Sequence, residues 1–191
     1  MPDLKDELHR KLRESREVLL SKLDGLGEYD RRRPLTGTGT NLLGLVKHLA
    51  GLEYLYLGEA FGHPAPESMS WVEDGSIWEG ADMWATAEES SDYIIGLYRR
   101  ACAHADGVIA ALDLEAPGSV AHWPAQRRET TLGFLLIRMV AETAQHAGHA
   151  DIVRELIDGK GGADQDSFGE STWREYIAAV RAAADSFAAE G

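Results

Sequence analysis

The sequence predicts an all-α fold, a four-helix bundle with an additional C-terminal helix. Apolar residues recur at helical spacing over four long segments, and no segment alternates with period two for long enough to predict a sheet. The hydrophobic fraction of 44% is sufficient for a sizeable core in 191 residues. We therefore expect a single domain over residues 1–191, with the bundle core at about 5–160 and the C-terminal helix at about 171–189.

The first two helices are predicted from apolar stripes and end signals. The first covers residues 3–26, and the glycine at position 27 is expected to end it. Its stripe consists of Leu4, Leu8, Leu12, either Val18 or Leu19, and Leu23. The second covers residues 42–62 and follows a polar segment in which Thr40 or Asn41 can cap the helix.

Two further long helices complete the predicted bundle. One covers residues 86–112 and opens with Thr86 and acidic residues, which a helix dipole favours in the first turn. The other covers residues 132–159, where Gly159 is expected to end it. A glycine-rich segment from residue 159 to residue 171 is expected to link it to the C-terminal helix.

Two connections are longer than a bundle requires. Residues 62–85 and residues 113–130 carry most of the tryptophans together with several charged side chains. Loops of this length are usually functional, which suggests that they border a binding site. The side chains that can line a pocket or clamp an anionic substrate are Trp71, Trp78, Trp84, Trp123, Arg127, Arg128 and Arg138.

Charge and cysteine content exclude several classes of function. With 32 acidic and 19 basic residues the formal charge is -13, so most of the surface is expected to repel nucleic acid. The single cysteine, Cys102, cannot form a disulfide within the chain. The N-terminal segment is charged where a signal peptide has its apolar core, and no apolar run reaches the ~20 residues of a membrane span. We therefore expect a cytoplasmic protein with no membrane partner.

The helix over 132–159 carries ionisable residues at positions expected to face the core. Its predicted seam is Leu135, Met139, Glu142, His146, His149, Val153 and Leu156, with spacings that alternate between four and three. Glu142, His146 and His149 are consecutive positions of this seam, so their side chains can converge beside the helix. Buried ionisable groups persist only when they are paired, hydrogen-bonded or bound to a metal.

The second helix supplies a complement, because His48 lies in line with Leu45 and Leu52 and is also expected to face inward. A histidine from one helix with a glutamate and a histidine from another make a ligand set that suits catalytic zinc or non-haem iron. A buried hydrogen-bond network is the alternative that these residues leave open. Glu53 is expected either to support the site or to be exposed, and His9 to lie on a solvated face.

Two motifs resemble the DinB-like superfamily of metal-binding four-helix bundles. They are LVKHLAGLEYLYLGEAFG, which contains His48, and ETAQHAGHADIVRELIDG, which contains Glu142 and His146. The likeness covers about residues 5–160 and is greatest to an actinobacterial branch of unknown function labelled mini-circle protein. The resemblance implies that His48, Glu142 and His146 hold a divalent metal ion, most often zinc or nickel. Many relatives have histidine at the position of Glu142, so His149 is an alternative ligand or a supporting partner.

The resemblance also implies an activity, the transfer of a low-molecular-weight thiol such as mycothiol or bacillithiol, or an isomerisation that such a thiol assists. A metal-dependent hydrolase, with His149 or His122 as proton shuttle, is a second hypothesis. The third is a stress-associated binding module without enzymatic activity. In that case the small-residue surface of the C-terminal helix would support a homodimer.

Overall fold

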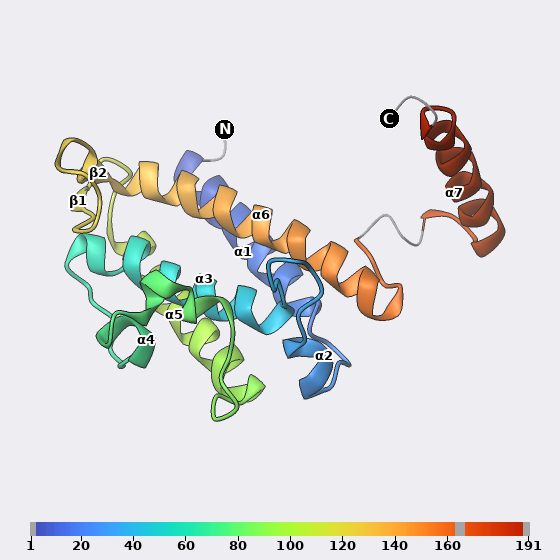
Figure 1. The fold of residues 1–191 in the computed structure, drawn as a ribbon. Coiled ribbons are helices and arrows are strands. Elements are labelled where there is room, and N and C mark those ends of the chain that lie inside the picture. The colour runs from blue at the N-terminus through green and yellow to red at the C-terminus, as the bar shows by residue number, and fades with distance from the viewer. Residues whose placement is uncertain (1–2, 163–166, 189–191) are drawn as a thin grey trace.

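The computed structural model describes residues 3–162 and 167–188 of the chain. The bundle is formed by α1 (Leu4–Ser21), α3 (Leu42–Leu57), α5 (Ser91–Ala111) and α6 (Leu132–Asp158) (Figure 1). Short helices, α2 (Glu28–Arg32) and α4 (Ser70–Glu73), and a two-stranded antiparallel sheet of β1 (Pro117–Ser119) and β2 (Glu129–Thr131) lie in the connections. The predicted all-α bundle is confirmed, and the sheet went unpredicted because strands of three residues are too short to show a period.

Two predicted helix ends are confirmed. The Asn41 side chain caps α3 by accepting a hydrogen bond of 2.8 Å from the backbone N–H of Gly44. Gly159 follows α6 with a φ of 77°, a left-handed conformation that glycine adopts without steric cost.

Three other predicted ends are wrong. α1 ends at Ser21 rather than at residue 26, α3 ends at Leu57 rather than at residue 62, and α5 begins at Ser91 rather than at residue 86. The residues before α5 have tertiary partners instead. The guanidinium of Arg32 donates to the carbonyl oxygens of Thr86 and Glu89, and this holds the segment outside the helix.

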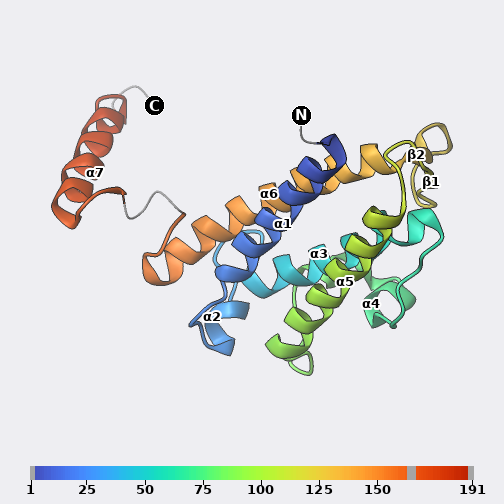
Figure 2. The same ribbon diagram turned by 180° about the vertical axis from the view of Figure 1, so that it is seen from behind.

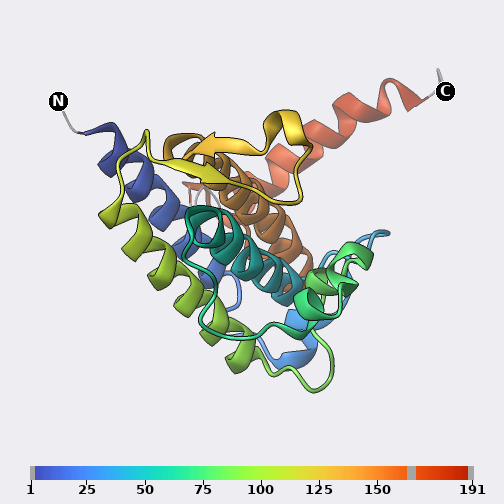
Figure 3. The ribbon, with the colours of Figure 1, turned by 90° about the vertical axis from the view of Figure 1, so that its left-hand side faces the viewer.

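The helices do not simply alternate in direction. Lys47 near the start of α3 pairs with Glu89, just before α5, and Tyr54 near the end of α3 stacks on His104 near the end of α5. α3 and α5 are therefore parallel neighbours, and the chain between them must return along the whole bundle. Residues 58–90 make this crossover and pass over the outside of α3 and α5 (Figure 3). The length of the predicted 62–85 connection thus has a topological cause.

The core lies between the four long helices, and α3 occupies its centre. α3 packs against both α5 and α6, while α1 packs mainly against α6. Nearly every residue of α3 is buried, which its apolar sequence permits. Two buried clusters fill the interior, one around Leu49 and Tyr98 and the other around Leu57 and Leu136.

A network of charged side chains crosses this core. Glu53 on α3 is fully buried and accepts two hydrogen bonds, of 2.7 Å and 2.6 Å, from the guanidinium of Arg16 on α1. Arg16 also donates to Asp106 on α5, and His9 bonds the same carboxylate. The two options predicted for Glu53 are therefore both wrong, and His9 is part of this buried network rather than of a solvated face. One arginine between two carboxylates ties three helices together.

The C-terminal helix α7 (Glu170–Asp185) is present but buries none of its residues. It lies apart from the bundle, beyond the end of α6 (Figure 2). The predicted linker contains residues 163–166, and the predicted C-terminal helix reaches residue 189. These positions lie outside the described residues. A single domain over 1–191 stays a prediction.

Among the described helices, none combines the length and apolar character that crossing a membrane requires.

Candidate metal centre

His48 sits on the side of α3 that faces α6, where its side chain is 18% exposed. Its Nδ1 lies 2.6 Å from Oδ2 of Asp82, which belongs to the short 3-10 helix η3 (Ala81–Met83) in the crossover. A neutral imidazole that donates from Nδ1 leaves the lone pair of Nε2 free. This lone pair points toward α6, because Nε2 of His48 lies 3.9 Å from Oε1 of Glu142.

Glu142 and His146 lie one helical turn apart on α6. Their side chains are 26% and 13% exposed, and Oε1 of Glu142 lies 3.3 Å from Nε2 of His146. Burial lowers the pKa of His146, the nearby His48 lowers it further, and Glu142 opposes the shift. A lowered pKa keeps this imidazole neutral at physiological pH, which is the form that binds a metal.

The predicted seam of α6 needs a correction. Thr143, Ala147 and Ala150 are buried, whereas Glu142 and His146 lie half-buried at the edge of this face. His149 is exposed, and Leu156 is 58% exposed. Small side chains occupy this buried face. They carry little hydrophobic signal, so sequence alone favoured the larger residues beside them.

The structure brings His48, Glu142 and His146 together as a group that can hold a metal ion. One donor atom from each residue lies within 4.8 Å of the others. Neighbouring ligand atoms of a tetrahedral zinc site are about 3.3 Å apart, as bond lengths of ~2.0–2.1 Å require. The two separations from Glu142 Oε1, 3.3 Å and 3.9 Å, are close to that value. With three protein donors, such a site keeps a coordination position for another molecule.

The two predicted proton shuttles lie outside this group. The ring centroid of His149 is 5.4 Å from that of His146, but the residue is exposed. His122 lies in the 113–130 connection, where its ring contacts Tyr56, Trp78 and Trp123. Tyr56 is eight residues after His48 on α3, about 12 Å along the helix axis, so His122 is not a neighbour of the three donors. Partial burial and the charge of Arg138 lower the pKa of His122.

The four tryptophans of the long connections have different environments. Trp71 is buried beneath the ammonium group of Lys47, which lies 4.0 Å from its ring centroid. Trp71 and Trp84 line one cavity of about 320 Å³, and Trp123 lines another of about 310 Å³. Trp78 is exposed and lines neither of these two cavities.

Asp82 is the site residue that sequence reasoning missed. It lies thirty-four residues after His48 in an irregular, glycine-containing segment, and no spacing rule links the two positions. Two backbone contacts place η3 against α3. The Asn41 side chain donates to the carbonyl oxygen of Met83, and the absence of a Cβ at Gly44 allows that carbonyl to approach. The helix cap of α3 thus also positions the partner of His48.

Fold and site together define a class, a four-helix bundle of DinB-like type whose interior carries two histidines and a glutamate as candidate metal ligands. A family model described as Mycothiol-S-transferase matches residues 7–159. The chain therefore belongs to this DinB-like family.

The structural comparison agrees on the fold. A conserved protein from Enterococcus faecalis has a crystal structure that matches with a TM-score of 0.63 and 14% sequence identity. The match covers 84% of this chain and 100% of that one, and at this identity it shows the fold alone. The search of curated proteins found no match.

Proposed function

We propose that the protein is a divalent-metal-dependent transferase that joins the sulfur of mycothiol to an electrophilic acceptor. His48, Glu142 and His146 would hold the ion, and zinc or nickel suits a set of two imidazoles and one carboxylate. A divalent ion so held lowers the pKa of a thiol bound to it and thereby supplies a nucleophile near neutral pH. The observation that carries the proposal is the convergence of the three donor atoms, with the His48 tautomer set by Asp82.

The state of the protein's own cysteine supports an external thiol. Burial raises the pKa of Cys102, and the nearby Glu53 carboxylate raises it further. A thiol with a raised pKa is a poor nucleophile. Cys102 lies on α5 among the core residues and is not one of the residues grouped around His48. The sulfur for a transfer reaction would therefore come from a small molecule, as the family description indicates.

The proposal predicts a spectroscopic signature in protein loaded with cobalt. Titration with mycothiol should release the thiol proton and produce a sulfur-to-cobalt charge-transfer band, because a thiolate is a stronger ligand than water for such an ion. Replacing His48 by alanine should abolish the band together with the cobalt. Bacillithiol is the comparison thiol.

Absence of a band with both thiols would contradict the proposal. If esters or amides were then hydrolysed without any thiol, the hydrolase hypothesis would replace it. A metal-bound water that titrates near neutrality would support that replacement.

A second prediction concerns Asp82. In Asp82→Asn the amide can keep a contact with His48 but loses the negative charge that strengthens the ligand, so zinc affinity should fall by about 10- to 100-fold. Competition with a chromophoric chelator measures this change. Asp74→Asn is the matched control, because the Asp74 side chain accepts a bond from Ser76 in the same connection without contacting the donors. An unchanged zinc affinity in Asp82→Asn would show that Asp82 does not contribute to metal binding.

A further inference from the structure

Near the start of α6, two arginines have no carboxylate partner among the described residues. In this acidic chain Arg16, Arg100 and Arg154 each bond a carboxylate. Within the described residues Arg127 and Arg138 instead contact aromatic rings. The Cζ atom of Arg138 lies 4.9 Å from the ring centroid of Tyr56 and 5.5 Å from that of Trp123. Arg127 lies over the Trp123 ring at 5.9 Å, so this indole is shared by two guanidinium groups.

Arg138 lies on α6 one turn before the donor group, and its guanidinium packs on Tyr56, which is about 12 Å along α3 from His48. This arginine lies four residues before Glu142 on α6, about 6 Å along the helix axis and on a similar side of the helix. The side chain is half-buried, and its Nε atom is buried without a hydrogen-bond partner in the described part of the chain. A buried donor without a partner is costly unless a bound group satisfies it. Stacking on Tyr56 and Trp123 holds the guanidinium in a defined orientation, which is the requirement for recognising a planar anion.

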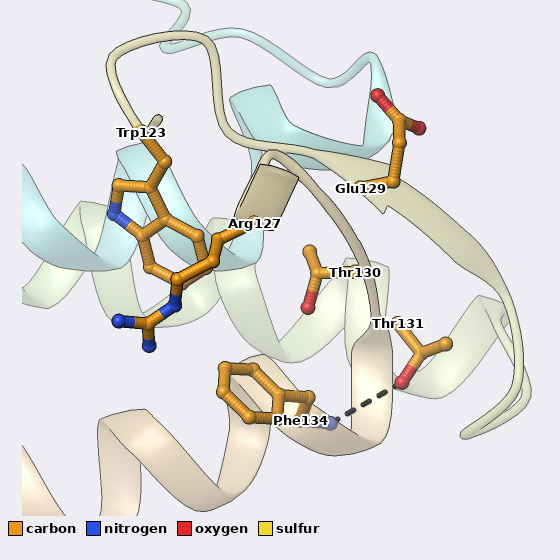
Figure 4. Close-up of a pocket in the computed structure, with 6 residues that line it drawn as sticks. All are labelled: Trp123, Arg127, Glu129, Thr130, Thr131 and Phe134. Carbon is orange, nitrogen blue, oxygen red and sulfur yellow. Dashed lines mark hydrogen bonds between the residues drawn. The ribbon is translucent and has the colours of Figure 1, made fainter. Parts of the chain in front are cut away.

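A cavity of about 310 Å³ lies next to these arginines, at the start of α6 (Figure 4). It is lined by Trp123, Arg127, Glu129, Thr130, Thr131 and Phe134. The rings of Trp123 and Phe134 are 6.3 Å apart between centroids and form apolar walls, and the guanidinium of Arg127 lies beside the two rings in Figure 4. The Glu129 carboxylate points away from these rings and accepts a hydrogen bond from Ser119. The volume is at the lower end of the range for small-molecule sites.

We propose that Arg138 and Arg127 bind a carboxylate group of the acceptor substrate, whose apolar or aromatic body lies against Trp123 and Phe134. This inference rests on the proposed transferase function and names the acceptor class. A guanidinium binds a carboxylate through two parallel hydrogen bonds, and aromatic walls suit an apolar body. Apart from its thiol, mycothiol carries amides and hydroxyls but no carboxylate, so the anionic group belongs to the acceptor.

The test compares a carboxylate with its uncharged amide. The five tryptophan indole N–H signals are followed by NMR in ¹⁵N-tryptophan-labelled protein, and Trp123→Phe assigns the reporter signal. 4-Phenylbutanoate should shift the Trp123 signal and bind at least about tenfold more tightly than 4-phenylbutanamide, because a charge-assisted pair is stronger than a neutral one. Arg138→Gln should remove this preference. Arg138→Lys should keep only part of this preference, since lysine keeps the positive charge but cannot form the two parallel hydrogen bonds of a guanidinium.

Arg99→Gln is the matched control, because Arg99 is an exposed arginine on α5. It should leave the preference unchanged. Equal binding of acid and amide, or an unchanged preference in Arg138→Gln with the other indole signals at their native positions, would overturn the inference. The titration is made on metal-free and on zinc-loaded protein. The outcome is read together with the thiol titration of the cobalt-loaded protein. Carboxylate binding with no sulfur-to-cobalt band would support the anion site and refute the transferase. A band with no preference for the carboxylate would support the transferase and refute the anion site.

Discussion

His146→Ala should lose the metal ion almost completely. Wild-type protein purified without a histidine tag is expected to hold about one zinc or nickel ion per chain, and the variant should bind zinc more weakly by a factor on the order of 10² or more. The reason is that Nε2 of His146 is one of three proposed donor atoms, and the described part of the chain adds no fourth ligand to this group. Elemental analysis and chelator competition measure stoichiometry and affinity.

His149→Ala is the control for this substitution. His149 is exposed on the next turn of the same helix, with its ring 5.4 Å from that of His146, and it is not in the donor group. The control variant should bind metal as the wild type does. Wild-type stoichiometry and affinity in His146→Ala would refute the ligand assignment, and loss of metal in His149→Ala alone would make His149 the ligand.

Arg16→Met should destabilise the fold by about 3–5 kcal/mol at neutral pH, which is a large part of the stability of an ordinary domain. The substitution leaves Glu53 fully buried without its guanidinium partner. Burial raises the pKa of Glu53 even in the wild type, and Arg16 offsets only part of that effect. Chemical denaturation followed by circular dichroism measures the change in the free energy of unfolding.

The loss of stability caused by Arg16→Met should depend on pH in a definite direction. A carboxyl group whose pKa is raised on folding costs stability while it is ionised, so the loss should shrink as the pH falls and Glu53 takes up a proton. The double variant Arg16→Met with Glu53→Leu should recover most of the stability, because no buried charge remains there. Arg13→Met is the surface control, since Arg13 is exposed and pairs with Oδ2 of Asp106 rather than with Glu53. A loss in Arg16→Met that is independent of pH and persists in the double variant would contradict this explanation.

Much of the bundle was predictable because its signals are local. Asn41 at the start of α3 and Gly159 after α6 act on backbone groups a few residues away, so their roles can be read from the sequence. The pair Glu142 and His146 is also local, since a spacing of four places two side chains on one side of any helix. His48 was predicted to face inward because it lies in line with Leu45 and Leu52 at helical spacing.

Other features depended on how the helices meet. The buried Arg16–Glu53 pair joins α1 and α3, and the position of Glu53 in the sequence indicates neither its burial nor its partner. The start of α5 moved to Ser91 because Arg32 and Lys47 bind the preceding residues. An intrinsic capping preference is weak compared with several tertiary hydrogen bonds, so the tertiary contacts decided the boundary.

The sequence by itself thus determined the four long helices and three residues able to ligate a metal. Only the tertiary structure decided that α3 and α5 run parallel, which sends residues 58–90 back along the bundle and brings Asp82 to within 2.6 Å of His48. It also decided that His149 faces solvent while His146 does not. The physical reason is that a helix's period specifies which residues share a face, whereas its rotation against its neighbours depends on the packing of side chains from other helices.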